Sequence, residues 1–407
     1  MNLINIINLF ILTECAQCVV KFHFNRKYNT SNIDKTFNYI NYILNNDLIT
    51  EISIGTPFQK IPISIRMEQE PTYLTPPFLN GLFNSNNSKT FYSDFIEGEY
   101  GDEIIKKAYS FQDNINLDFL DNEKIISNIT FLYAIKQKSK RNKLNLGNLG
   151  LYYKPYSGNN SLNLIFQLKN KNLISSLVYS FNFINDNEGD LYIGEYPHIF
   201  NKSYFNDFNL NNINVNLLFV WSSQFDKITF GNDIIEIKRF YLNSSLGGII
   251  GPKKFLDNIQ KLYFNQKIKE NKCKILNENI YIYFECNKDL DISDFPNLDF
   301  YLKENNLNFN INYNDLFEVI NDKLYCKLIF QKYNTLHWYL GIPFLKKYIV
   351  AFDQDKKLFT FYKMNNEKTN FIPLYLLICF VLILILSRYY KPKRIRSSEI
   401  DYNLIDI

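Results

Sequence analysis

The residues of this 407-residue chain that could do chemistry are few and scattered. Its three histidines and six cysteines show no spacing typical of a zinc site, and we expect no metal and no cofactor. One charged stretch, Arg66-Met-Glu-Gln-Glu70, directly follows an apolar, strand-like run. A lone carboxylate at Glu68 or Glu70 could act as a general base in principle. The simpler interpretation is that both are solvated, or that one pairs with Arg66.

The elements that must position such residues are predominantly β-strands. Hydrophobic residues make up 46% of the chain and aromatic residues 17%, a composition that favours a folded, strand-rich protein. Alternating apolar and polar residues, broken by Gly, Asn, Asp and Pro, predict strands at 48–54, 191–193, 227–230, 280–284 and 356–362. The clearest amphipathic helix is predicted at 252–264.

The two halves of this β pattern show a weak internal symmetry. Glu51-Ile-Ser-Ile-Gly-Thr in the first half is matched by Asp226-Lys-Ile-Thr-Phe-Gly-Asn in the second. Gly147-Asn-Leu-Gly-Leu is matched in the same order by Trp338-Tyr-Leu-Gly-Ile. The repetition predicts two related β lobes.

Six segments, in the right order, resemble the pepsin-like aspartic protease family (peptidase family A1) over about residues 45–365. They are Ile52–Lys60, Gly147–Leu151, Ser176–Gly194, Trp221, Lys227–Gly231 and Trp338–Asp353. The resemblance implies a mainly β, bilobed pepsin-like acid protease fold over residues 47–365. Lobe one would cover about 47–200 and lobe two about 201–365, preceded by a short pro-like segment at 19–46.

Active members of that family carry two Asp-Thr/Ser-Gly triplets, whose carboxylates lie side by side and share one proton. No Asp in this chain is followed by Thr or Ser. Arg66 stands at the first dyad position, and Asn243, followed by Ser244 and Ser245, stands at the second. Arginine is effectively always protonated and asparagine cannot ionise, so the resemblance implies the fold without the usual peptidase chemistry.

The same resemblance implies cleft residues and a disulfide. Glu68, Tyr92 and Ser245 are the candidates for lining the cleft between the lobes, with Tyr92 as the flap tyrosine. The family places a disulfide in lobe two at the positions of Cys286 and Cys326. Cys273 would then be free or paired elsewhere.

The two ends of the chain predict a single-pass type I membrane protein. Residues 1–18 resemble a secretory signal without a positive start, the alternative being an ordinary N-terminal strand or helix. Residues 371–390 are apolar enough to span a bilayer, the alternative being a buried core helix. The basic residues that follow mark 391–407 as a cytoplasmic tail. They also account for the formal net charge of +4, which leaves no electrostatic footprint for nucleic acid.

A lumenal or extracellular ectodomain, in the endomembrane system or at the cell surface, permits disulfides and N-glycosylation. Acceptor sequons occur at Asn29, Asn86, Asn128, Asn159, Asn201 and Asn243. In the tail, Tyr402-Asn-Leu-Ile405 resembles a Tyr-x-x-apolar sorting signal and implies a cytoplasmic sorting adaptor as partner. The alternative is an unstructured tail.

The sequence therefore favours a catalytically inactive, membrane-anchored relative of the pepsins that binds a peptide or protein segment in its cleft. Two alternatives stay open. One is an aspartic-type endopeptidase with unorthodox catalytic residues, and the other is a structural surface glycoprotein whose cleft has filled in.

Overall fold

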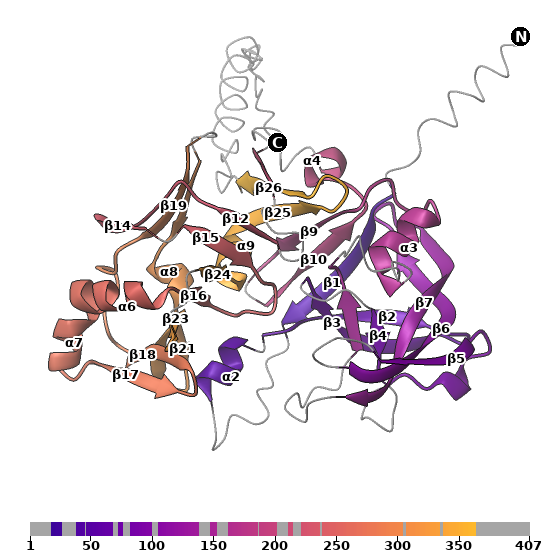
Figure 1. Ribbon diagram of the computed structural model, residues 1–407, viewed down its shortest axis with the longest axis horizontal. Coiled ribbons are helices and arrows are strands. Elements are labelled where there is room, and N and C mark those ends of the chain that lie inside the picture. Colours follow the sequence, from indigo (N-terminus) through magenta and orange to yellow (C-terminus); the bar gives the residue numbers. More distant parts are fainter. Residues whose placement is uncertain are drawn as a thin grey trace, which may run out of the picture. The chain divides into compact units, whose positions relative to one another are not determined.

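The computed structural model describes most of the chain between residues 18 and 363 (Figure 1). The described residues are 18–26, 38–44, 46–67, 72–75, 82–99, 105–137, 147–152, 162–185, 187–201, 211–214, 221–236, 238–303, 307–333 and 337–363. Among them, no helix is long and apolar enough to cross a membrane. The signal-like residues 1–17, the candidate span 371–390 and the tail lie outside the described residues.

The largest sheet joins strands from both ends of the chain. Thirteen strands of the described residues form it, in the order β11-β26-β25-β9-β10-β1-β2-β3-β8-β4-β7-β6-β5. Their bounds are β1 Val20–Arg26, β2 Leu48–Ile54, β3 Gln59–Arg66, β4 Tyr73–Leu74, β5 Tyr92–Glu99, β6 Ile105–Asp118, β7 Lys124–Gln137, β8 Gly147–Gly150, β9 Val178–Phe183, β10 Glu188–Ile193, β11 Asn211–Asn214, β25 Tyr348–Asp353 and β26 Leu358–Lys363.

The second half of the chain supplies two further sheets. In the described part of the chain, one has nine strands and one has four. The nine are β12 Ser222–Gln224, β15 Arg239–Leu242, β16 Ile249–Gly251, β17 Cys273–Glu278, β18 Tyr281–Asn287, β21 Phe317–Ile320, β22 Lys323–Cys326, β23 Leu328–Gln331 and β24 Trp338–Leu340. The four are β13 Lys227–Phe230, β14 Asp233–Ile235, β19 Leu298–Leu302 and β20 Leu307–Ile311.

Helices are short and connect these strands. They are α2 Tyr39–Leu44, α3 Leu164–Asn170, α4 Pro197–Phe200, α6 Lys253–Ile259, α7 Asn265–Lys269, α8 Tyr313–Leu316 and α9 Ile342–Lys347, with a 3-10 turn at Ser85–Asn87 and a π-helical stretch at Gln260–Phe264. The predicted helix at 252–264 is confirmed, and it continues through α7. Its buried residues Phe255, Ile259 and Phe264 follow helical spacing and pack into the core.

The internal symmetry seen in the sequence corresponds to matching strand pairs. In the first half, β3 runs parallel to β8, with Ile65 opposite Leu149. In the second half, β15 runs parallel to β24, with Leu242 opposite Leu340. The matching registers make Arg66, the last residue of β3, and Asn243, the residue after β15, equivalent positions in the two halves.

The turns that follow β2 and β13 each contain a glycine with a positive φ angle. Gly55, after β2, has φ +91°, and Gly231, after β13, has φ +58°. Residues with a side chain adopt positive φ less readily than glycine does, so glycine is favoured at each turn. The two turns thus have the same local preference in both halves.

Aromatic side chains fill the core of the second half. Trp338 is fully buried and packs on Phe255 and on Phe300, with ring centroids 5.6 Å away in each case. Phe225 stacks on Phe240 with centroids 4.2 Å apart. Edge-to-face and offset contacts of this kind add to the hydrophobic burial and help to fix β15 and β24 in place.

The disulfide predicted between Cys286 and Cys326 is wrong. The structure links Cys273 to Cys286, and Cys326 is a buried free thiol. The reason is strand register: Cys273 lies directly opposite Cys286 in the β17–β18 hairpin, whereas β22 places Leu324 opposite Cys286. Because directly opposed side chains on antiparallel strands are the nearest neighbours, the hairpin decides the pairing.

We expect chemical mapping to reproduce this arrangement. A non-reducing peptide map of the native protein should contain one linked peptide pair holding Cys273 and Cys286. Cys326 should be alkylated only after unfolding, because burial raises the pKa of its thiol to about 12 and leaves it protonated at pH 8. A linked Cys286–Cys326 peptide, or rapid alkylation of Cys326 in the native protein, would contradict the register.

Candidate functional site

The candidate site is built where β3 and β15 end. Arg66 is the last residue of β3, and Asn243, Ser244 and Ser245 follow β15. The Arg66 guanidinium donates from Nη1 to Ser245 Oγ at 3.0 Å. The two loops that carry the predicted dyad positions are therefore brought together, with Arg66 of one in direct contact with Ser245 of the other.

Arg66 has further partners around its guanidinium. Its Nε donates to Ser64 Oγ at 3.1 Å, and its Nη2 lies 2.5 Å from Oδ1 of Asp47 in an ion pair. The side chains of Arg66 and Asp47 are only 16% and 11% exposed. A guanidinium held in this way is a permanent cation and a hydrogen-bond donor, so it cannot accept a proton from water.

Asn243 is occupied by its own loop. Its Oδ1 accepts the backbone N–H of Ser245 at 2.7 Å, and its own N–H donates to the carbonyl of Leu340 at 3.1 Å. This short side chain-to-backbone bond is the usual way that asparagine fixes a turn. The amide that replaces the second carboxylate thus holds the loop and offers no ionisable group.

Residues 46 and 47, directly before β2, lie across these loops. The backbone N–H of Asn46 donates to the carbonyl of Ser245 at 3.1 Å, and the N–H of Gly247 donates to the carbonyl of Ile43 at 2.7 Å. Arg26, at the end of β1, donates from Nε to Asn46 Oδ1 at 3.0 Å. A Cβ on Gly247 would lie 2.3 Å from Asn46 Nδ2, so a side chain at this position would have to displace that of Asn46.

Helix α2 holds the preceding residues against the nine-stranded sheet (Figure 1). Tyr39 is 1% exposed, stacks on Tyr325 with centroids 4.3 Å apart, and donates its hydroxyl to the carbonyl of Cys326 at 3.0 Å. Burial raises the pKa of the Tyr39 phenol well above its ordinary value. Tyr42 donates to Glu318 Oε1 at 2.8 Å. Residues 38–44, 46 and 47, hereafter the inner segment, are therefore bound by both apolar and polar contacts.

Asn46 and Asp47 were missed by the sequence reasoning. The one signal that could have found Asp47 is Arg66 itself, because a buried guanidinium needs a carboxylate partner. The Asn-Asp pair immediately before β2 is close enough in the fold to supply one.

The other predicted site residues are placed less tightly. Tyr92 lies on β5 opposite Gln112 and is 61% exposed, so its ring is not packed down into a buried site. Glu68 and Glu70 lie outside the described residues, as do the sequons at Asn29 and Asn159 and the tail residues Tyr402 and Ile405. Asn86 and Asn128 are exposed and Asn201 is half-buried. Glycosylation at these three stays a prediction.

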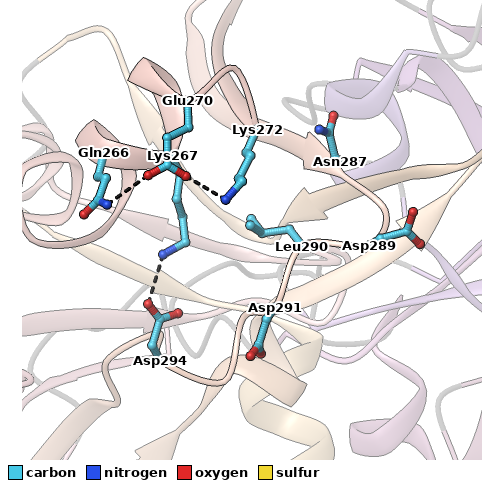
Figure 2. A pocket seen from close by; sticks show the side chains of 9 residues that line it. All are labelled: Gln266, Lys267, Glu270, Lys272, Asn287, Asp289, Leu290, Asp291 and Asp294. Carbon is cyan, nitrogen blue, oxygen red and sulfur yellow. Dashed lines mark hydrogen bonds and ion pairs between the residues drawn. The ribbon is translucent and has the colours of Figure 1, made fainter.

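A separate cavity of about 490 Å³ lies in the second half of the chain, beside α7 (Figure 2). Its polar side chains largely satisfy one another: Lys267 pairs with Asp294 at 3.0 Å, and Glu270 pairs with Lys272 at 2.7 Å. Asp291 accepts the backbone N–H of Ser293 at 2.9 Å, and this bond lowers the pKa of its carboxyl. None of the dyad-position residues lines the cavity. Within the described residues, no group of three or more His, Cys, Asp or Glu is arranged to hold a metal ion.

Comparison with known proteins identifies the class. The family model described as eukaryotic aspartyl protease matches residues 78–364, which is more than half of the chain. The chain therefore belongs to the eukaryotic aspartyl protease family, as the sequence motifs predicted, and its mainly β structure of paired, related halves is consistent with the bilobed fold of that family. The match begins after Arg66 and includes Asn243. No curated protein matches the chain.

Proposed function

We propose that this member of the family does not hydrolyse peptides and instead binds a polypeptide segment between its lobes. The observation that carries the proposal is the Arg66 contact set: a guanidinium bound to Ser245 and Asp47 occupies the place where an active member has a shared carboxylate pair. Acid proteolysis needs one ionised and one protonated carboxylate at a single site. Here the same positions offer a cation and an amide.

Support for binding comes from the inner segment. It makes backbone hydrogen bonds to Ser245 and Gly247, the type of contact by which extended or turning peptides are recognised. Loss of catalysis is thus accompanied by retention of a surface that holds polypeptide. In the structural-glycoprotein alternative, the inner segment would fill this surface permanently, and no other polypeptide would bind there.

The test is one assay that scores cleavage and binding together. We expect the purified protein to give no turnover of quenched-fluorescent peptide libraries between about pH 2 and 7, while retaining a subset of the peptides. An Asn243→Ala variant is the matched control. Wild-type turnover that disappears in this control would favour the unorthodox peptidase, and failure to retain any peptide would favour the structural alternative.

Restoring the missing acids should not restore activity. In Asn243→Asp alone, Arg66 would pair with the new carboxylate and hold it ionised. In Arg66→Asp with Asn243→Asp, Asp47 adds a third carboxylate, and Met67 and Ser245 stand where the family has Thr and Gly. We expect turnover at the background rate in both variants. Turnover of the double variant well above that rate would show that the two loops still place the new carboxylates side by side.

We also propose that the protein is anchored by residues 371–390 with its pepsin-like part outside the cytoplasm. The uncharged sequence of this segment and the basic residues that follow it support the proposal. Ending the chain before Phe371 should release a soluble, glycosylated protein, whereas the full-length chain should resist carbonate extraction. Extraction of the full-length chain by carbonate would refute the anchor.

A further inference from the structure

The surface beneath α2 is shaped around one tyrosine side chain. The ring of Tyr39 stacks on Tyr325 with centroids 4.3 Å and planes 16° apart, and its centroid lies 5.1 Å from that of Tyr283. Its hydroxyl donates to the backbone carbonyl of Cys326 at 3.0 Å. Tyr39 is 1% exposed, so it is almost fully enclosed. The two rings and the carbonyl, hereafter the tyrosine site, therefore contact both the ring and the hydroxyl of the side chain that they hold.

The two rings of the tyrosine site are oriented by the nine-stranded sheet itself. The Tyr283 hydroxyl donates to Glu278 Oε2 at 3.3 Å, and the Tyr325 hydroxyl donates to Glu285 Oε2 at 3.3 Å. All four residues lie on β17, β18 and β22. Because neither hydrogen bond involves α2, both rings keep these partners when α2 leaves. The tyrosine site is therefore preformed.

The carbonyl of the tyrosine site distinguishes tyrosine from phenylalanine. Burial raises the pKa of the Tyr39 phenol well above its ordinary value, so the hydroxyl keeps its proton and stays a donor. A phenylalanine ring would have nearly the same shape but would leave the carbonyl of Cys326 without this donor. A site that hydrogen-bonds a hydroxyl discriminates against the analogue that lacks it.

Helix α2 occupies the tyrosine site through few residues. It has six residues, of which Tyr39, Ile40 and Ile43 are buried. Helices of this length are not stable alone, so α2 depends on its contacts with the sheet and can open locally while the rest stays folded. Ile43 lies one helical turn after Tyr39 and is buried in the same apolar cluster. Another polypeptide with the same two anchors could replace them.

Resting on the proposed peptide-binding function, we propose that this surface selects helical segments that present a tyrosine and, four residues later, an aliphatic residue. Tyr39 and Ile43 are the built-in occupants, and a ligand displaces them. A helical turn whose anchors lie on one side is a recurring form of peptide recognition. The tyrosine enters the tyrosine site, and the aliphatic residue takes the place of Ile43.

The first measurement uses the full-length wild-type protein and the peptide library of the cleavage-and-binding assay. The retained peptides are sequenced. We expect enrichment of tyrosine followed four residues later by Leu, Ile or Val. Retention without enrichment of tyrosine would overturn the selectivity while leaving the proposed binding function in place. If nothing is retained, both fail.

The second measurement uses the full-length Tyr39→Ala variant, in which the built-in ring is gone. The ligands are a fluorescent peptide of residues 38–47 and the same peptide with Tyr39→Phe or Tyr39→Ala. We expect the tyrosine peptide to bind about fivefold to tenfold more tightly than the phenylalanine peptide, the range for one net hydrogen bond. It should bind at least about a hundredfold more tightly than the alanine peptide. Wild-type protein should bind it more weakly than the variant does, because the tethered Tyr39 competes at high effective concentration.

A matched pair of further variants locates the bound tyrosine. Tyr325→Leu, added to Tyr39→Ala, removes the stacking ring and should reduce the preference for the tyrosine peptide over the alanine peptide. Tyr333→Leu in the same background changes a tyrosine that is 69% exposed and should leave the preference unaltered. Each preference is measured on one protein, so a change in stability cannot imitate it. Equal binding of the three peptides to Tyr39→Ala, or an unchanged preference after Tyr325→Leu, would overturn the tyrosine site.

Discussion

Replacing Arg66 with methionine is expected to lower the free energy of unfolding by about 3–5 kcal/mol, the range for breaking one side of a buried ion pair. The substitution keeps much of the apolar volume but leaves the Asp47 carboxylate, 11% exposed, without its cation. It also removes the donors that reach Ser64 and Ser245. Urea unfolding followed by tryptophan fluorescence measures the change.

A second substitution separates the charge effect from the packing effect. Arg66→Met combined with Asp47→Leu should recover most of the lost stability, because a well-packed apolar pair often replaces a buried ion pair at little cost. Asp47→Leu alone should be destabilising, since it removes the carboxylate that forms the buried ion pair with Arg66. If the single Arg66 variant loses less than about 1 kcal/mol, the range of a solvent-screened surface pair, the ion pair does not hold the inner segment.

Replacing Tyr39 with alanine should release helix α2 from the nine-stranded sheet. The ring is 1% exposed and stacks on Tyr325, and truncation of a buried aromatic side chain costs about 3–5 kcal/mol. Because α2 is a short peripheral element, we expect this cost to appear as local opening and not as global unfolding. Tyr39→Phe is the control, since it keeps the ring and loses one hydrogen bond worth about 1 kcal/mol.

Two backbone amides report on this opening directly. The N–H of Gly247 bonds to Ile43, and the N–H of Asn46 bonds to Ser245, so both bonds break when the inner segment leaves. Hydrogen exchange at these amides should accelerate at least a hundredfold or so in Tyr39→Ala, which corresponds to about 3 kcal/mol. Amides of the β6–β7 pair should be unchanged. Unchanged exchange at Gly247 would mean that the segment is held without Tyr39.

Much of the framework could be predicted from the sequence because its signals are local. The strand at 48–54 is visible as alternation and its turn as a Gly-Thr-Pro triplet, and β2 has the predicted bounds. Arg66 could be located because it follows the apolar, strand-like run 61–65, and Asn243 because it precedes the Ile-Ile-Gly-Pro segment at 249–252. Motifs of this kind fix position along the chain, and the family comparison confirms the class that they indicate.

The errors concern which residues meet across the fold. Choosing among Cys273, Cys286 and Cys326 requires the register of β17, β18 and β22, and register is a property of pairing that no single strand reveals. Asp47 was missed for a related reason. Its partner Arg66 lies on the neighbouring strand β3, and the contact depends on the path of the chain before β2.

The strand order of the large sheet has a consequence for biosynthesis. Strand β9 at 178–183 pairs on one side with β10, but its other neighbour is β25 at 348–353, followed by β26. During translation, the edge of β9 therefore presents unpaired backbone N–H and C=O groups until nearly the whole described chain has been made. Exposed edges of this kind invite pairing with other chains, so the nascent protein should depend on chaperones during that interval. A message that ends before residue 348 would yield a product whose open edge cannot be closed.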